Sequence, residues 1–251
     1  MKIALKITPQ RSTQYANMTA QLAIPELLAS PVGRDIVKAE PVNLAGQGYL
    51  LVSFVDTLEA LTQLQIEYLS RLGATSEIYE YFDQIGEIAG PLLRPFDPAF
   101  RPFVPLEMAE ARRYKGKTNE IFTRVLLNVA LYAGDYRDRV TERLRILDPL
   151  AGGGTTLFLA LAAGYDAFGI EQERQDVETT AVFAKQYFQG ERISYHEEEQ
   201  KHRTGKRILF EVGKPEKRWL VFAQGDNRQA DQVLANVPGG PRMHAIVGDL
   251  P

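Results

Sequence analysis

The fold is decided by residues 144–171, which read LRILDPLAGGGTTLFLALAAGYDAFGIE. The stretch opens with a short apolar run that is typical of a buried parallel strand, and Pro149 ends this strand because proline donates no backbone hydrogen bond. The three glycines at 152–154 permit a turn with positive φ and leave the backbone open to a ligand where the next helix begins. An apolar helix over 157–163 and a second strand over 167–170 follow. The stretch therefore predicts a strand–turn–helix–strand unit of an α/β fold.

A carboxylate follows each of these two strands. Glu171, about 20 residues past the glycine turn, is placed to accept hydrogen bonds from both hydroxyls of a ribose. Asp148 can orient the cationic amino end of a bound methionine moiety, whereas it would repel a pyrophosphate. The nicotinamide fingerprint needs a third glycine where this chain has Leu157, and a P-loop needs a lysine that is absent here. S-adenosyl-L-methionine is the cofactor class that remains.

The composition excludes several kinds of site. The 251 residues, 45% hydrophobic, suffice for two domains, and a net charge of −3 means that any nucleic-acid contact depends on local basic patches. The absence of cysteine excludes disulfides and base methylation through a cysteine nucleophile. With three histidines in the chain, we expect no metal site. Because the sequence has no long apolar run and no signal-peptide pattern, we expect a cytoplasmic protein without membrane contact.

Residues 1–90 have the pattern of a small N-terminal α+β domain. Apolar and basic residues alternate at 2–8, and an apolar strand YLLV lies at 49–52. A helix is expected over 14–30, in which Pro25 should force a break or a kink.

The rest of the chain divides at a proline-rich segment. Residues 91–111 are predicted to be a linker, and 112–251 form the α/β domain. Within it, 190–213 is predicted to be an inserted polar arm, whose basic cluster either anchors phosphates or is a solvated charged face. Two strand-like runs at 208–212 and 219–223 are separated by a turn signal, which predicts a hairpin.

The pattern DPxxGxGTT at 148–156, followed by GIE at 169–171, resembles motifs I and II of the amino-methyltransferases that modify exocyclic nitrogens of nucleic-acid bases. The resemblance implies a Rossmann-like methyltransferase sheet with S-adenosyl-L-methionine as cofactor. An ordinary α/β turn with an incidental acid is the alternative. The residues expected to bind the cofactor here are Asp148, Pro149, Gly152, Gly154, Thr155, Thr156, Glu171 and Gln172.

Two further segments match motifs of this family. The equivalent of motif X implies that Lys117, Thr118 and Asn119 touch the methionine end of the cofactor. Otherwise Thr118 only caps a helix that runs from Asn119 onward. Asp226 matches the family residue that accepts a hydrogen bond from the adenine amino group, with Asn227 beside it. Asp226 can also cap the helix that follows, and both roles are compatible.

The segment from Gly248 onward resembles motif IV of the same family up to, but not including, its aromatic residue. The resemblance implies that the Asp249 carboxylate and the Leu250 carbonyl bind the two hydrogens of a base amino group, while Pro251 fixes the loop. The lone pair of that nitrogen would then face the sulfonium methyl. Leu250 replaces the commoner proline, a departure that some RNA-guanosine members share, which favours RNA over DNA.

A sheet of this family has about three strands beyond motif IV, so we expect a sheet that is incomplete at its C-terminal side. We also expect that a second chain completes the sheet and that this chain alone is inactive. The sequence thus predicts a methyltransferase that resembles the tRNA guanosine-N2 methyltransferases and the DNA amino-methyltransferases. Two alternatives remain: methylation of a protein glutamine or a small amine, and a non-catalytic subunit that binds the cofactor or RNA.

Overall fold

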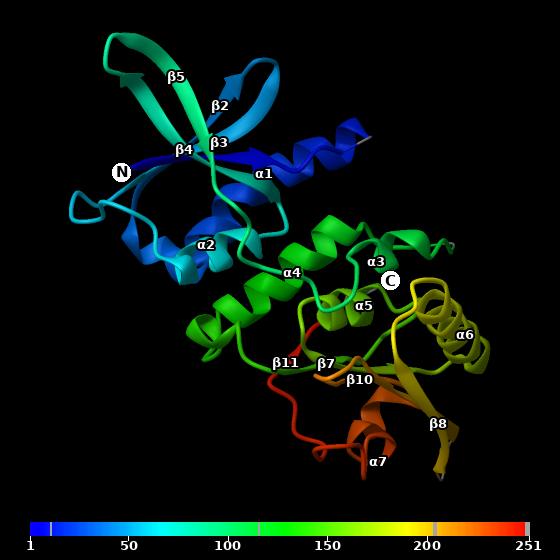
Figure 1. The fold of residues 1–251 in the computed structure, drawn as a ribbon. Coiled ribbons are helices and arrows are strands. Elements are labelled where there is room, and N and C mark those ends of the chain that lie inside the picture. Colours follow the sequence, from blue (N-terminus) through cyan, green and yellow to red (C-terminus); the bar gives the residue numbers. More distant parts are fainter. Residues whose placement is uncertain (11, 115, 203–204, 249–251) are drawn as a thin grey trace. The chain divides into compact units, whose positions relative to one another are not determined.

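The computed structural model describes residues 1–10, 12–114, 116–202 and 205–248 of the chain. The chain forms two compact units, each built around its own β-sheet (Figure 1). The first contains Met1–Arg101 and Arg124–Asp138, and the second contains Pro102–Thr123 and Arg139–Pro251. The fold is therefore mixed α/β, with two sheets of which one is partly parallel.

The first unit is an antiparallel sheet with helices packed on it. Its elements are β1 (Lys2–Ile7), α1 (Thr13–Ala29), a short 3₁₀ helix (Pro31–Asp35), β2 (Ile36–Leu44), β3 (Gln47–Phe54), α2 (Gln63–Ser70), β4 (Thr75–Ile85), β5 (Ile88–Pro95) and the part of α4 (Glu120–Tyr132) from Arg124 onward. The strand order is β2-β3-β1-β4-β5, and every neighbouring pair is antiparallel. Ile3 and Leu5 of β1 are fully buried and pair with Val52 and Leu50 of β3.

Pro25 was predicted to force a break or a kink, and the break is not observed, because α1 continues through this residue. Proline removes one helical hydrogen bond and frees the carbonyl four residues earlier, at Gln21. Pro25 and Gln21 are both exposed, so water can satisfy the freed carbonyl. The buried residues that follow, Glu26 and Leu27, keep the last turn packed.

The second unit has a mixed sheet. Its elements are α3 (Glu107–Ala111), the start of α4 (Glu120–Tyr132), a short 3₁₀ helix (Arg137–Arg139) that begins in the first unit, β6 (Arg145–Asp148), α5 (Thr155–Ala162), β7 (Asp166–Glu171), α6 (Arg174–Gly190), β8 (Tyr195–His202), β9 (Gly205–Val212), β10 (Arg218–Gln224), a second 3₁₀ helix (Asn227–Gln229), α7 (Ala230–Val233) and β11 (Ala245–Ile246). The order is β11-β6-β7-β10-β9-β8. The first four strands are parallel, and β9 and β8 are antiparallel additions at the edge.

The unit built from residues 144–171 is present as predicted, as β6, α5 and β7. A Cβ atom at Gly169 would lie 2.5 Å from Cδ1 of Leu157, so this glycine lets α5 pack closely on β7. Phe168 and Ile170, which flank Gly169 in β7, are fully buried. The predicted hairpin of 208–212 and 219–223 is also confirmed, as β9 and β10.

Two segments differ from expectation. The polar residues expected as an arm at 190–213 form β8 and β9, which pair as a hairpin at the sheet edge. β8 is an edge strand whose residues are exposed or half-buried, so it lacks the apolar alternation that marks a strand. The predicted linker at 91–111 overlaps the end of β5 and contains α3.

No helix among the described residues combines the length and the apolar character that a membrane crossing needs.

Candidate functional site

A pocket of about 630 Å³ lies at the carboxyl ends of β6, β7 and β10. Ligand pockets in proteins have volumes of about 300–1,000 Å³, so a molecule of cofactor size can be accommodated. Open α/β sheets bind ligands at this edge, where the strand order reverses. Here the order reverses between β6 and β11, because the chain runs from β6 to one side of the sheet and returns with β11 on the other.

Most of the residues predicted to bind a cofactor line this one pocket. They come from the glycine turn after β6, from the ends of β7 and β10, and from the segment before α4. They are Asp148, Pro149, Gly152, Thr155, Thr156, Glu171, Gln172, Asn227 and Thr118. Residues that are distant in sequence meet here because the carboxyl ends of parallel strands share one edge of the sheet.

The glycine turn uses the conformational freedom that glycine offers. Gly152 and Gly154 have φ values of 45° and 83°, and Gly154 is the N-cap residue of α5. Gly154 shapes the turn without lining the pocket. Gly153 serves a different purpose, because a Cβ atom there would overlap the ring of Tyr114.

The Glu171 carboxylate is held in place by two backbone donors. Its Oε2 accepts the N–H of Gly152 at 2.9 Å, and its Oε1 accepts the N–H of Glu173 at 2.8 Å. A carboxylate has about four lone-pair sites, so each oxygen can accept a second hydrogen bond from a ligand. The strand end and the glycine turn are thus tied together, and the acid at the pocket wall is preorganised.

Asp148 is 3% exposed and ends β6. Its Oδ1 accepts the backbone N–H of Leu150 at 3.0 Å, which fixes the carboxylate at the start of the turn. Asp176, in the first turn of α6, also lines the pocket. Among the described lining residues, Asp148, Glu171 and Asp176 are acidic and Arg112 is basic, so the pocket is predominantly acidic.

Two pocket residues, Arg112 and Tyr114, were not predicted. The Tyr114 hydroxyl lies 2.8 Å from Oγ1 of Thr155, and burial raises the pKa of this phenol, which keeps it protonated. The Arg112 guanidinium donates to Oγ1 of Thr180 at 2.8 Å and to the carbonyl of Thr179 at 3.1 Å. The sequence feature that could have indicated them is an aromatic residue that stands between basic residues at 112–115.

The three residues predicted from motif X have different surroundings. Thr118 lines the pocket, but Lys117 and Asn119 do not. The ammonium of Lys117 donates to the carbonyl of Glu110 at 3.1 Å and lies 3.4 Å from the Glu120 carboxylate. Asn119 caps α4, since its Oδ1 accepts the N–H groups of the second and third residues that follow, both at 3.0 Å. The predicted cap, Thr118, is therefore off by one residue.

Asp226 has the capping role that the sequence allowed. Its Oδ1 accepts the backbone N–H of Arg228 at 2.9 Å, and the Arg228 guanidinium ion-pairs with the carboxylate at 2.6 Å. This hydrogen-bonded arginine lowers the pKa of Asp226. Gly225 and Asn227 line the pocket, whereas Asp226 does not. Gly225 must also be small, because a Cβ atom there would overlap Val233 of α7.

The residues predicted for catalysis, Asp249, Leu250 and Pro251, lie outside the described residues. The last described residue before them is Gly248. A Cβ atom on Gly248 would lie 3.3 Å from Oδ1 of Asp148 and 3.3 Å from Cδ of Pro149. After β11 the chain therefore passes beside the Asp148 carboxylate of the pocket.

Within the described parts of the chain, no three or more histidine, aspartate or glutamate residues are grouped so that they could hold a metal ion. The side chains that line the pocket include three acids, threonines, Arg112, Tyr114, two amides and several apolar residues, and the excess of acids suits an organic ligand with positive charge. No protein-family model matches the chain, and no curated protein matches it in sequence.

Proposed function

We propose that the pocket binds S-adenosyl-L-methionine and that the protein transfers its methyl group to an exocyclic nitrogen of a nucleic-acid base. The observation that carries the proposal is the placement of Asp148 and Glu171, which end neighbouring parallel strands and line one pocket on either side of a glycine turn. In this proposal the second sheet is a Rossmann-like methyltransferase sheet. Its four parallel strands and the reversal between β6 and β11 support that interpretation.

The position of Glu171 suits the ribose of the cofactor. Both oxygens already accept one backbone N–H, which orients the carboxylate, and each retains a lone pair for a hydroxyl. Hydrogen bonds to a charged acceptor contribute about 1.5–3 kcal/mol each. Glu171 is therefore the residue whose loss should weaken cofactor binding most clearly.

The charges of the pocket favour this cofactor over phosphate-rich ones. S-adenosyl-L-methionine carries a sulfonium and an ammonium group, which Asp148 and Asp176 attract, and one carboxylate, which suits Arg112 and the N–H groups of the turn. A pyrophosphate or triphosphate would face three acids. Electrostatic repulsion between the phosphates and these carboxylates argues against the binding of nicotinamide dinucleotides and ATP.

The acceptor side of the proposal rests on the resemblance at 248–251. In the proposed step, Asp249 and the Leu250 carbonyl orient the amino group of the base. The nitrogen lone pair attacks the methyl carbon, the sulfur keeps the electrons of the broken bond, and the methylated nitrogen then loses a proton to water. Gly248 lies against Asp148, so this segment begins at the proposed cofactor site. RNA is preferred to DNA because of Leu250.

The proposal is tested by titrating the protein with S-adenosyl-L-methionine in a calorimeter and then assaying transfer of labelled methyl to bulk tRNA, DNA and protein. Glu171→Ala should weaken binding by about tenfold or more. Glu173→Ala is the matched control, because Glu173 is exposed, makes no cap hydrogen bond and does not line the pocket.

Each outcome has a distinct meaning. Binding with transfer to tRNA supports the proposed function and shows that the expected inactivity of this chain alone is wrong, and transfer only to DNA or protein overturns the choice of substrate. Binding without transfer agrees with an enzyme that acts only together with a second chain, or with a cofactor-binding subunit. Absence of binding by the wild-type protein overturns the proposal.

A further inference from the structure

Arg112 is a half-buried arginine in the wall of the pocket. All the acceptors that the described residues offer to its guanidinium are neutral. Nη1 donates to the carbonyl of Thr179 at 3.1 Å, and Nη2 donates to the hydroxyls of Thr179 and Thr180 at 3.3 and 2.8 Å. The rings of Tyr114 and Phe183 lie 5.6 and 5.5 Å from its central carbon. The positive charge of Arg112 is therefore held in place by neutral groups.

Not all N–H donors of this guanidinium are used. Its Nε is buried and has no acceptor among the described residues, and Nη1 makes one contact although it carries a second hydrogen. Burial lowers the pKa of Arg112, because the charged form loses hydration that no ion pair replaces. An anionic group of a ligand would supply the missing interaction.

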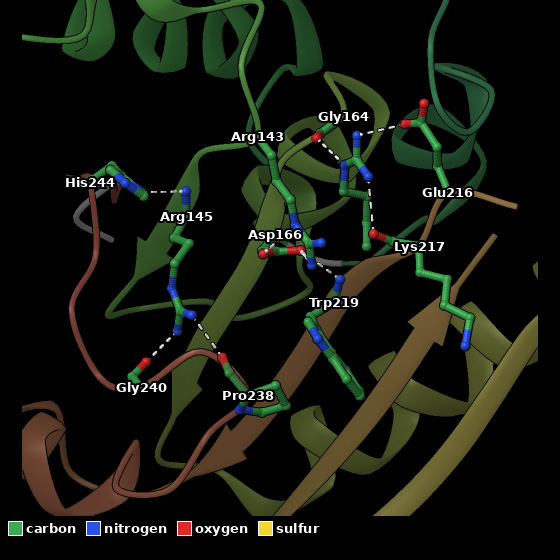
Figure 2. Close-up of polar contacts among 11 residues, drawn as sticks. Arg143, Arg145, Gly164, Asp166, Glu216, Lys217, Trp219, Pro238, Gly240 and His244 are labelled. Atoms are coloured by element: carbon green, nitrogen blue, oxygen red, sulfur yellow. Dashed lines mark hydrogen bonds and ion pairs between the residues drawn. The ribbon is translucent and has the colours of Figure 1, made fainter. Parts of the chain in front are cut away.

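Other arginines of the second unit are satisfied by the protein itself (Figure 2). Arg143 ion-pairs with the Asp166 carboxylate at 2.8 Å, and Arg145 donates to the carbonyls of Pro238 and Gly240. Neither arginine lines the pocket. Arg112 is thus the basic residue, among the described residues of the lining, whose charge is open to a ligand.

Arg112 is tied to the glycine turn through one hydroxyl. The Thr180 Oγ1 that accepts from Arg112 also donates to the carbonyl of Gly152 at 3.4 Å. The guanidinium is thereby fixed beside the turn, where the backbone is open to a ligand.

Two acids act on the same part of the pocket. Burial lowers the pKa of Arg112, and the charge of Asp176 opposes this effect. Burial raises the pKa of Tyr114, and the charges of Asp148 and Asp176 raise it further. One cation and two anions near Tyr114 complement the carboxylate and the ammonium of an α-amino acid.

The acids alone would favour a ligand that has only positive charges. Decarboxylated S-adenosylmethionine is such a ligand, because it keeps the adenosine, the sulfonium and the ammonium but lacks the carboxylate. The attraction of Asp148, Glu171 and Asp176 gives this ligand no disadvantage against S-adenosyl-L-methionine. A preference for the ligand with a carboxylate therefore depends on a positive charge in the pocket, which Arg112 supplies.

We propose that Arg112 is the specificity-determining residue of the pocket: it binds the carboxylate of the amino-acid end and so selects S-adenosyl-L-methionine over cationic adenosyl ligands that lack this group. This inference rests on the proposed function and deepens it. Hydrogen bonds between a guanidinium and a carboxylate are charge-assisted and are stronger than bonds between neutral groups. The loss of this interaction should therefore appear in the affinity for one ligand and not for the other.

The test is a calorimetric titration of the chain with S-adenosyl-L-methionine and, separately, with decarboxylated S-adenosylmethionine. Arg112→Gln removes the charge, and Arg112→Lys keeps it without the planar fork of arginine. Arg113→Gln is the matched control, because Arg113 is the next residue, is exposed and does not line the pocket. Both ligands are titrated into the same preparation, so poor folding of a variant reduces the binding capacity for both and leaves the ratio of the two Kd values unchanged.

We expect the wild-type protein to bind S-adenosyl-L-methionine more tightly than the decarboxylated ligand. In Arg112→Gln the Kd for S-adenosyl-L-methionine should rise about tenfold or more, while the Kd for the decarboxylated ligand stays within about threefold. Arg112→Lys should keep part of the preference, and Arg113→Gln should keep all of it.

Two results would overturn the inference while the cofactor site stands. One is a wild-type protein that binds both ligands equally, and the other is an Arg112→Gln protein in which the two Kd values change by the same factor. If the wild-type protein does not bind S-adenosyl-L-methionine, the proposed function is wrong and the role of Arg112 is wrong with it. The wild-type titration thus separates the two kinds of failure.

Discussion

The Glu171 carboxylate accepts the backbone N–H of Gly152 at 2.9 Å, which joins the end of β7 to the turn after β6. The bond has two consequences. It fixes the orientation of an acid that lines the pocket, and it holds the turn in the conformation that needs positive φ at Gly152. A ligand that bonds with Glu171 is therefore in reach of the backbone N–H groups of the turn.

Gly153→Ala should destabilise the second unit, because a Cβ atom there would overlap the Tyr114 ring. Overpacking of this kind reduces the free energy of unfolding by about 1–3 kcal/mol. Urea denaturation followed by the fluorescence of Trp219, the single tryptophan, measures the change in this unit. Gly190→Ala is the control, since Gly190 ends α6 with open space around its Cβ position. Equal stability of the two variants would contradict the packing described here.

Tyr114→Phe should weaken binding of S-adenosyl-L-methionine by about two- to tenfold. The variant keeps the ring over the turn but loses the hydroxyl contact with Thr155, and one hydrogen bond contributes about 0.5–1.5 kcal/mol. Calorimetric titration measures the difference. Tyr187→Phe, in α6 and outside the pocket, should bind as the wild type does. A Tyr114→Phe protein with wild-type affinity would show that the hydroxyl does not shape the site.

The second unit should lose stability as the pH falls, through His244. Burial is the main cause of its lowered pKa, and Arg139 and Arg145 lower it further, against the opposite effect of Asp166 and Glu142. Because the folded pKa lies below the ordinary value of 6.5, the neutral form is favoured in the folded state. Its contribution to stability is present above pH 6.5 and is lost as the pH falls through the folded pKa.

The pH effect is measured by urea denaturation at about pH 7.5 and about pH 5.5. His244→Asn is the comparison, because its amide oxygen can replace Nδ1 as acceptor for the Arg145 N–H without titrating. The wild-type protein should lose more free energy of unfolding between the two pH values than this variant. Parallel losses would assign the pH dependence to other groups.

Glu26→Ala should destabilise the first unit by about 3 kcal/mol or more. The Glu26 carboxylate is fully buried and accepts from the N–H groups of Gly73 and Ala74 at 2.8 and 2.9 Å and from the Asn128 amide at 2.7 Å. Alanine would leave the N–H groups of Gly73 and Ala74 without this acceptor, whereas the Asn128 amide also donates to the carbonyl of Arg71 at 2.9 Å. Thermal unfolding followed by circular dichroism is suitable, since Trp219 lies in the other unit. The control is Glu59→Ala, because Glu59 is exposed, and its free energy of unfolding should stay within about 0.5 kcal/mol of the wild type. An equally small change for Glu26→Ala would contradict the role given to this carboxylate.

The central unit could be predicted from the sequence because its signals are local. The apolar strand, the proline, the glycines and the apolar helix all lie within 144–171, and each acts on its neighbours in the chain. Asp148 and Glu171 lie at one edge of the sheet because they are the last residues of the parallel strands β6 and β7. The strand at 208–212 was visible because it is buried and apolar.

The contacts made by side chains across long sequence distances could not be predicted. Tyr114 meets Thr155 across 41 residues, and Arg112 meets Thr180 across 68, so no local pattern announces either contact. The wrapping of Arg145 by residues 238–240 was hidden for the same reason. β8 was missed because an exposed edge strand of charged residues has no apolar period.

The most direct test of the central claim is a calorimetric comparison of ligands with the wild-type protein. The chain is titrated in turn with S-adenosyl-L-methionine, NAD and ATP under the same conditions. The account predicts saturable binding of S-adenosyl-L-methionine at one site and no measurable binding of NAD or ATP, because three acids line the pocket. Binding of ATP or NAD in place of S-adenosyl-L-methionine, or no binding of any of them, would contradict it.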